Sequence, residues 1–199
     1  MCKKVFGQHF YKTTEENRYY FVSFSAIRER DFFMKNSWTK FITRTALVAG
    51  VYILSTLIVF PVASGAIQFR ISEALCLLPL IFVDAVPGLF IGCLLSNLIT
   101  GCSPADVILG SVITLTASIF TFFTGKIFKN KWLKVMVGGI FPVLLNALFL
   151  PLIWLLYGTG AYVYYLEVCF LLIGQTVSVY LLGIPMYFKL EKLNAKGRL

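Results

Sequence analysis

Long apolar runs separated by short polar or basic stretches dominate the chain. A spanning helix requires about 17 to 25 mostly apolar residues, and four runs meet that length: residues 41–62, 105–123, 135–157 and 162–188. Two shorter runs, 71–83 and 85–100, each contain a proline. We interpret them as two short membrane helices, with one re-entrant pair as the alternative. The pattern predicts an all-α integral membrane protein with about six transmembrane helices.

The composition supports this prediction. Of the 199 residues, 58% are hydrophobic and only 14% are charged, and the mean hydropathy is +0.82. A soluble domain of this length could not remove so much apolar surface from water. We therefore expect one membrane domain over residues 34–192, preceded by an N-terminal extension (1–33) and followed by a basic tail (193–199).

Basic residues gather in three places, and these places set the expected orientation. Loops on the cytoplasmic side of a membrane collect Lys and Arg. With six helices, all three clusters fall on one side, which predicts that both termini are cytoplasmic. The net charge of +9 is then an orientation signal, because the basic residues form no single stripe for nucleic acid. The clusters are Lys35, Lys40 and Arg44; Lys126, Lys129, Lys131 and Lys134; and Lys189, Lys192, Lys196 and Arg198.

Most polar residues near the predicted helices can be explained as helix caps, and only a few cannot. Ser103 and Asp106 in "SPAD" are typical of a helix N-cap, and Asp84 is interpreted as a cap or loop residue. Intramembrane polar groups are costly and are therefore functional candidates. The alternatives to a functional role are an ion pair between Arg70 and Glu73 and interhelical hydrogen bonds for the side-chain amides of Asn146 and Gln175. The candidates are Arg70, Glu73, Asn97, Asn146, Glu167 and Gln175, with Glu167 near the headgroup level.

Small residues recur at a spacing of four and predict close helix contacts. Gly88, Gly92 and Ser96 form one such stripe. Another, in the first helix, contains Ala46 and Gly50, with Ala49 beside them. Internal packing explains most stripes of this kind. The stripe of the first helix is also a candidate docking surface for another protein.

The sequence offers no catalytic machinery. The cysteines form no C-x-x-C pair, and the only histidine, His9, lies in the polar N-terminal stretch. We expect no metal site, no cofactor and no enzymatic activity. The phosphate-binding pattern G-x-x-x-x-G-K-[ST] is also missing. Active transport would therefore require an ion gradient or a partner ATPase.

Three segments carry a resemblance to a known family. "AIQFRISEALCLLP", "AVPGLFIGCLLSNLITG" and "SPADVILGS" resemble the QueT family, the substrate-binding S components of energy-coupling factor (ECF) transporters. "TRTALVAGVYI" and "YLLGIPMYFKLEK" resemble its first and last helices. The resemblance implies an S-component-like bundle in a bacterial cell membrane that imports queuosine precursors, which are 7-deazaguanines. It also implies a transmembrane scaffold subunit and two cytoplasmic ATPases as partners.

The resemblance and the ligand chemistry together suggest a site. A deazaguanine presents two adjacent N–H donors, and the Glu73 carboxylate could accept both in a fork. Arg70 or Gln68 would hold the loop over the ligand or donate to its carbonyl, and Phe69 would stack on the ring. The predicted substrate-binding set is Gln68, Phe69, Arg70, Glu73, Asn97, Asn146 and Gln175.

The chain departs from the family pattern at two points. Gln175 follows Gly174 where members tend to have Gly-Glu, and a neutral amide does not offset the desolvation of an ammonium group. The substrate therefore stays open between 7-aminomethyl-7-deazaguanine and another deazaguanine such as queuine. Residues 1–33 are the second departure. They are either an upstream extension before a start at Met34, or an amphipathic segment on the inner membrane surface.

Other function classes remain as alternatives. One is a stand-alone ion-coupled carrier for a purine-like solute, although such carriers are often built from internal repeats and no convincing repeat is present here. The others are an intramembrane enzyme, which would need a catalytic set that the helices lack, and a purely structural membrane subunit.

Overall fold

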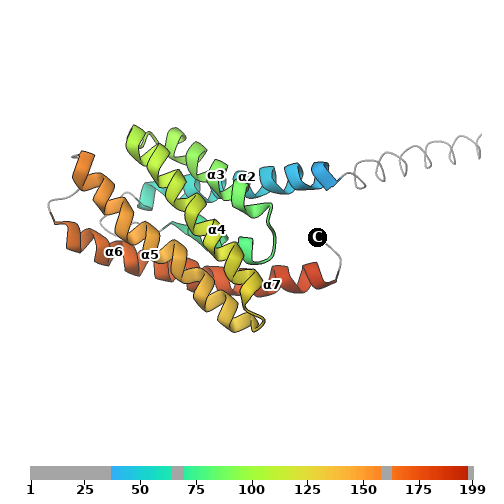
Figure 1. The fold of residues 1–199 in the computed structure, drawn as a ribbon. Helices are drawn as coiled ribbons and strands as arrows, with labels where there is room; N and C mark the ends of the chain where they lie inside the picture. Colours follow the sequence, from blue (N-terminus) through green and yellow to red (C-terminus); the bar gives the residue numbers. More distant parts are fainter. Residues whose placement is uncertain (1–36, 64–69, 158–162, 197–199) are drawn as a thin grey trace, which may run out of the picture. The chain divides into compact units, whose positions relative to one another are not determined.

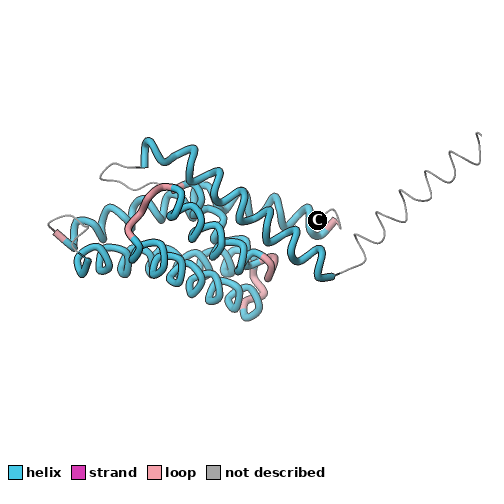
Figure 2. The backbone as a smooth tube through the Cα atoms, turned by 90° about the horizontal axis from the view of Figure 1, so that it is seen from above, coloured by secondary structure: helices cyan, strands magenta, loops and turns pink. Residues whose placement is uncertain are grey.

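The computed structural model describes residues 37–63, 70–157 and 163–196, without the side chains of 37 and 60–63. The predicted extension 1–33 and the site residues Gln68 and Phe69 lie outside this part. Every regular element in the described ranges is helical (Figure 2). The elements are α2 (Ser37–Ala63), the 3₁₀-helix η1 (Ile71–Leu80), α3 (Ala85–Ile99), the π-helix η2 (Asp106–Gly110), α4 (Ser111–Ile127), α5 (Lys131–Tyr157), α6 (Tyr164–Thr176), the π-helix η3 (Val177–Leu182) and α7 (Gly183–Ala195).

These elements confirm the predicted fold class. Four helical stretches are long and apolar enough to cross a membrane, and η1 and α3 are the two shorter apolar helices. The long stretches extend further than the apolar runs predicted, because helix continues over charged residues at the ends, such as Lys126, Lys131 and Lys192. Long basic side chains at helix ends reach the membrane interface with their charged groups.

The chain divides into two compact units, residues 1–43 and 44–199. Only the beginning of α2 is described in the first unit. All packing described below lies within the second.

The helix η1 is wound with three residues per turn, so its side chains form three stripes along the axis. Residues 72–80 are all buried. The stripe of Leu75 and Leu78 packs in a cluster with α2 and α3. The stripe of Leu77 and Leu80 packs in a cluster with α5, η3 and α7. The third stripe consists of Glu73, Cys76 and Pro79, and it places a carboxyl group inside the bundle.

Glycines set the close contacts among the later helices. Helices α4 and α5 lie side by side in opposite directions (Figure 1). A Cβ at Gly138 would lie 2.9 Å from a methyl group of Leu80 on η1, and one at Gly139 would lie 2.8 Å from the ring of Tyr180. The Tyr180 hydroxyl donates to the Met136 carbonyl at 2.7 Å. Helix α5 therefore packs tightly on both η1 and η3.

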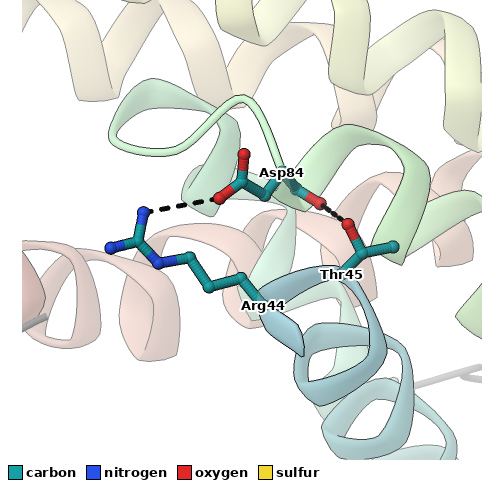
Figure 3. A network of polar contacts seen from close by, with 3 residues as sticks. All are labelled: Arg44, Thr45 and Asp84. Carbon is teal, nitrogen blue, oxygen red and sulfur yellow. Dashed lines mark hydrogen bonds and ion pairs between the residues drawn. The ribbon is translucent and has the colours of Figure 1, made fainter. Parts of the chain in front are cut away.

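The turn between η1 and α3 is held to α2 by polar contacts (Figure 3). The Arg44 guanidinium lies 3.4 Å from the Asp84 carboxylate, and the Thr45 hydroxyl donates to the Asp84 carbonyl at 3.1 Å. Arg44 also lies over the Phe82 ring, 5.1 Å from its centroid. Asp84 occupies the N-cap position of α3, but its side chain makes no capping hydrogen bond.

The glycine stripe of α3 packs against α2, as the internal-packing alternative expects. A Cβ at Gly88 would lie 2.9 Å from the Thr45 carbonyl oxygen, and one at Gly92 would lie 2.8 Å from Tyr52 Cβ. The contact fixes which face of α2 points inward. Tyr52 lies on that face and is buried.

We expect Gly92→Ala to destabilise the protein, because the added methyl group overlaps the Tyr52 side chain. Overpacking of this kind costs about 1–3 kcal/mol. Gly50→Ala is the matched control, since a Cβ there has no neighbour within 4 Å and replacing glycine inside a helix stabilises it by about 0.5–1 kcal/mol. Thermal unfolding in detergent measures both. Equal melting temperatures for the two variants would contradict the packing described here.

Candidate functional site

The most deeply buried charged residue of the described chain is Glu73, at 2% exposure. Three side chains donate to its carboxyl group. The Tyr52 hydroxyl lies 3.2 Å from Oε1, and the Cys76 thiol and the Asn146 amide nitrogen each lie 3.2 Å from Oε2. The donors come from α2, η1 and α5. One carboxyl group therefore joins three helices.

The hydrogen bonds leave the two oxygens unequal. A carboxylate offers roughly four lone-pair positions, about two on each oxygen. Oε2 already accepts from Cys76 and Asn146, whereas Oε1 accepts only from Tyr52. A ligand with two parallel N–H donors needs one position on each oxygen. It would use the open position of Oε1 and replace one donor at Oε2, and the thiol is the weaker of those donors.

Arg70 does not form the ion pair that sequence reasoning offered as the alternative role of Glu73. The described residues form two ion pairs, Arg44 with Asp84 and Lys131 with Glu191. Arg70 contacts Glu73 through the backbone, where its carbonyl accepts from the Glu73 amide at 3.1 Å. The Glu73 carboxyl group is thus held by uncharged donors.

The chain was compared with known proteins. A model of the QueT transporter family matches residues 42–192. The chain belongs to the QueT transporter family. The match runs from within α2 to within α7 and confirms the resemblance carried by the three quoted segments. No curated protein and no solved structure gives a significant match. The protein is therefore a membrane transporter component.

Gln175 is another deeply buried site candidate of this QueT member. It is 2% exposed, and its carbonyl oxygen has no hydrogen-bond partner among the described residues. The Ser178 hydroxyl, one turn further along, is also buried without a partner. The Gln175 carbonyl therefore does not take part in the interhelical hydrogen bond that is the alternative to a functional role for this side chain.

Asn97 has a different role in this structure. Its amide nitrogen lies 3.4 Å from the Asp106 carbonyl and 3.6 Å from the Cys93 sulfur. The Thr114 hydroxyl donates to the same sulfur at 3.4 Å. Asn97 thus links α3 to the start of η2, and no hydrogen bond connects it to Glu73. Its place in the substrate site stays a prediction.

The "SPAD" cap is formed as its spacing indicates. The Ser103 hydroxyl accepts from the Asp106 amide at 3.2 Å and donates to the Asp106 carboxylate at 2.8 Å. The other carboxylate oxygen of Asp106 accepts from the Trp154 indole at 2.8 Å. The cap therefore also holds the end of α5.

The predicted docking residues on α2 divide between two faces. Ala46 is exposed, and Gly50 has open space where a side chain would lie. Ala49 is 6% exposed, and its carbonyl oxygen would lie 3.2 Å from a Cβ at Gly92. An outward docking surface on this part of α2 can therefore include Ala46 and Gly50 but not the Ala49 side chain.

Sequence reasoning missed two members of the Glu73 cluster. Cys76 is not among the predicted site residues, and only the 3₁₀ winding of η1 places it on the Glu73 stripe. Tyr52 stands in the middle of an apolar helix, away from the interfaces where membrane tyrosines usually lie. That position was the available signal. No group of three or more His, Cys, Asp or Glu suited to a metal ion occurs in the described ranges.

Proposed function

We propose that the chain is the substrate-binding S component of an ECF importer in a bacterial plasma membrane, and that it binds a 7-deazaguanine precursor of queuosine from outside. The family match supports transport. The observation that carries the ligand class is the buried Glu73 carboxyl group, with an open acceptor position and uncharged hydrogen-bond donors. Both chain ends would lie in the cytoplasm.

Glu73 suits the pyrimidine edge of a deazaguanine because that edge carries two adjacent N–H donors. Charge-assisted hydrogen bonds to a carboxylate are about twice as strong as neutral ones. No lysine or arginine nitrogen of the described chain lies within ion-pair distance of Glu73, so the carboxylate is available to a neutral heterocycle. Asn146 would hold the carboxylate in place through its bond to Oε2.

Energy would come from partner subunits. The sequence has no phosphate-binding loop, and the family resemblance implies a membrane scaffold with two ATPases. The face of α2 around Ala46 and Gly50 is the proposed contact with the scaffold. Small residues there permit close approach of another helix.

The decisive test is Glu73→Gln. The amide turns one acceptor into a donor that faces the ligand's own donors, so affinity for queuine or 7-aminomethyl-7-deazaguanine should fall. Loss of charge-assisted bonds worth about 1.5–3 kcal/mol corresponds to roughly 10- to 150-fold in Kd. Equilibrium binding to the purified protein measures this. Glu191→Gln, which removes the carboxylate paired with Lys131, is the matched control.

Two outcomes count against the proposal. Near-normal affinity in the Glu73→Gln variant, with wild-type thermal stability, would remove Glu73 from the site. Failure of the wild-type protein to bind any 7-deazaguanine would overturn the ligand class itself.

Cys76 provides a second test because its thiol occupies a position on Oε2 that the ligand needs. Cys76→Ala frees that position, and ligand affinity should stay equal or rise. Cys76→Ser puts a stronger donor on the carboxylate, and affinity should fall several-fold, or roughly 1 kcal/mol. Equilibrium ligand binding, measured side by side on the two variants, tests whether the thiol competes with the ligand. Weaker binding by the alanine variant with unchanged binding by the serine variant would show that the thiol supports the ligand.

Replacement of Ala46 tests the partner surface. Ala46→Leu should abolish uptake into cells while the purified variant still binds ligand, because Ala46 is exposed and outside the core. Thr116→Leu is the control, since Thr116 is partly exposed and its hydroxyl bonds only to the Val112 carbonyl in its own helix. Uptake of labelled ligand and binding to purified protein are measured in parallel. Loss of both activities in Ala46→Leu would instead indicate internal packing.

A further inference from the structure

Two polar atoms on one face of the last long helical stretch are buried and have no partner. They are the Gln175 carbonyl oxygen, near the end of α6, and the Ser178 hydroxyl, at the start of η3. Gln175 is 2% exposed and Ser178 is fully buried. A buried polar group without a hydrogen bond costs about 1–3 kcal/mol. A group that satisfies both atoms would recover this free energy.

Ser178 shares with Ser72 on η1, and with no other buried serine or threonine of the described helices, a hydroxyl group that has no hydrogen-bond partner. Serine and threonine in a helix commonly donate to the carbonyl three or four residues earlier. The bundle uses this bond at Thr56, Ser96, Ser111, Thr114, Ser118 and Thr124. Ser178 makes no such bond. It stands where the α-helix changes to a π-helix, a local irregularity that is frequent at functional sites.

Packing places Gln175 near the level of Asn146, the residue that donates to Glu73. Gly139 on α5 meets Tyr180 on η3, and the two segments run in opposite directions (Figure 1). At the rise of an α-helix, Asn146 lies seven residues, or about 10 Å, beyond Gly139 along α5. Gln175 lies five residues, or about 7.5 Å, before Tyr180. Asn146 donates to Glu73 at 3.2 Å. Asn146 and Gln175 therefore lie at similar levels of the bundle, and Ser178 lies one turn closer to the level of Tyr180.

On the basis of the function proposed above, we propose that Gln175 and Ser178 form a second hydrogen-bonding edge of the substrate site. A free deazaguanine base carries, next to its pyrimidine edge, the N–H of the five-membered ring and a neighbouring ring nitrogen. The Gln175 carbonyl accepts from that N–H, and the Ser178 hydroxyl donates to the ring nitrogen. The pair therefore selects the free base over its nucleoside, in which the N–H is replaced by a sugar.

Ring analogues that lack one group at a time test each contact. Wild-type protein should bind 7-deazaguanine more tightly than 9-methyl-7-deazaguanine, which has no ring N–H, and more tightly than 3,7-dideazaguanine, which has C–H at the ring nitrogen. Ser178→Ala should weaken binding of 7-deazaguanine by roughly 2- to 12-fold, the value of one hydrogen bond. It should leave binding of 3,7-dideazaguanine unchanged. Gln175→Met should reduce the preference for 7-deazaguanine over the 9-methyl analogue.

Stability of the ligand-free protein gives an independent readout. Ser178→Ala removes an unsatisfied buried hydroxyl, so the melting temperature should stay equal or rise while affinity falls. Ser118→Ala is the matched control, because the Ser118 hydroxyl is buried and already bonded to the Leu115 carbonyl, and ligand affinity should not change.

The outcomes separate the two proposals. Equal weakening of both ring analogues by Ser178→Ala, or a lower melting temperature, would assign Ser178 a structural role and overturn the second edge while the ligand class stands. Wild-type protein that binds none of the three bases would overturn the ligand class, and the second edge with it.

Discussion

A single carboxyl group, that of Glu73, connects the helices on which the site depends. An acidic side chain in the interior of a membrane bundle is costly unless its oxygens are satisfied. Here the carboxyl oxygens accept hydrogen bonds from Tyr52 on α2, Cys76 on η1 and Asn146 on α5. Any shift of one helix against the others lengthens one of these bonds, so the position of the carboxyl group and the packing of the helices are fixed together.

The winding of η1 makes this arrangement possible. Three residues per turn align Glu73 with Cys76 and direct the two neighbouring stripes into separate apolar clusters. The carboxyl group is thereby kept apart from the leucines that anchor the helix. The contact of Arg44 with Asp84 holds the turn after η1 to α2. Glycines on α3 and α5 let neighbouring helices approach closely. A tightly packed frame surrounds a polar centre.

Much of the frame could be predicted from sequence because its signals are local. The length of each apolar run predicts a helix, and the spacing of Ser103 and Asp106 predicts a cap whose bonds span three residues. The site could be predicted only in part. Glu73 and Asn146 stood out as polar residues in apolar helices, but their contact joins residues far apart in the chain. Whether Ala49 faces in or out depends on how α3 packs against α2, which no local pattern contains.

Polarity inside the membrane does not by itself identify a binding group, and Asn97 and Gln175 show why. Both are amides buried in apolar helices. The Asn97 nitrogen is engaged by Asp106 and Cys93, so its hydrogen bonds stabilise the fold. The Gln175 carbonyl has no partner in the described protein, so its desolvation stays uncompensated until something binds. The discriminating property is unsatisfied hydrogen-bonding capacity after folding, which only the packed structure reveals.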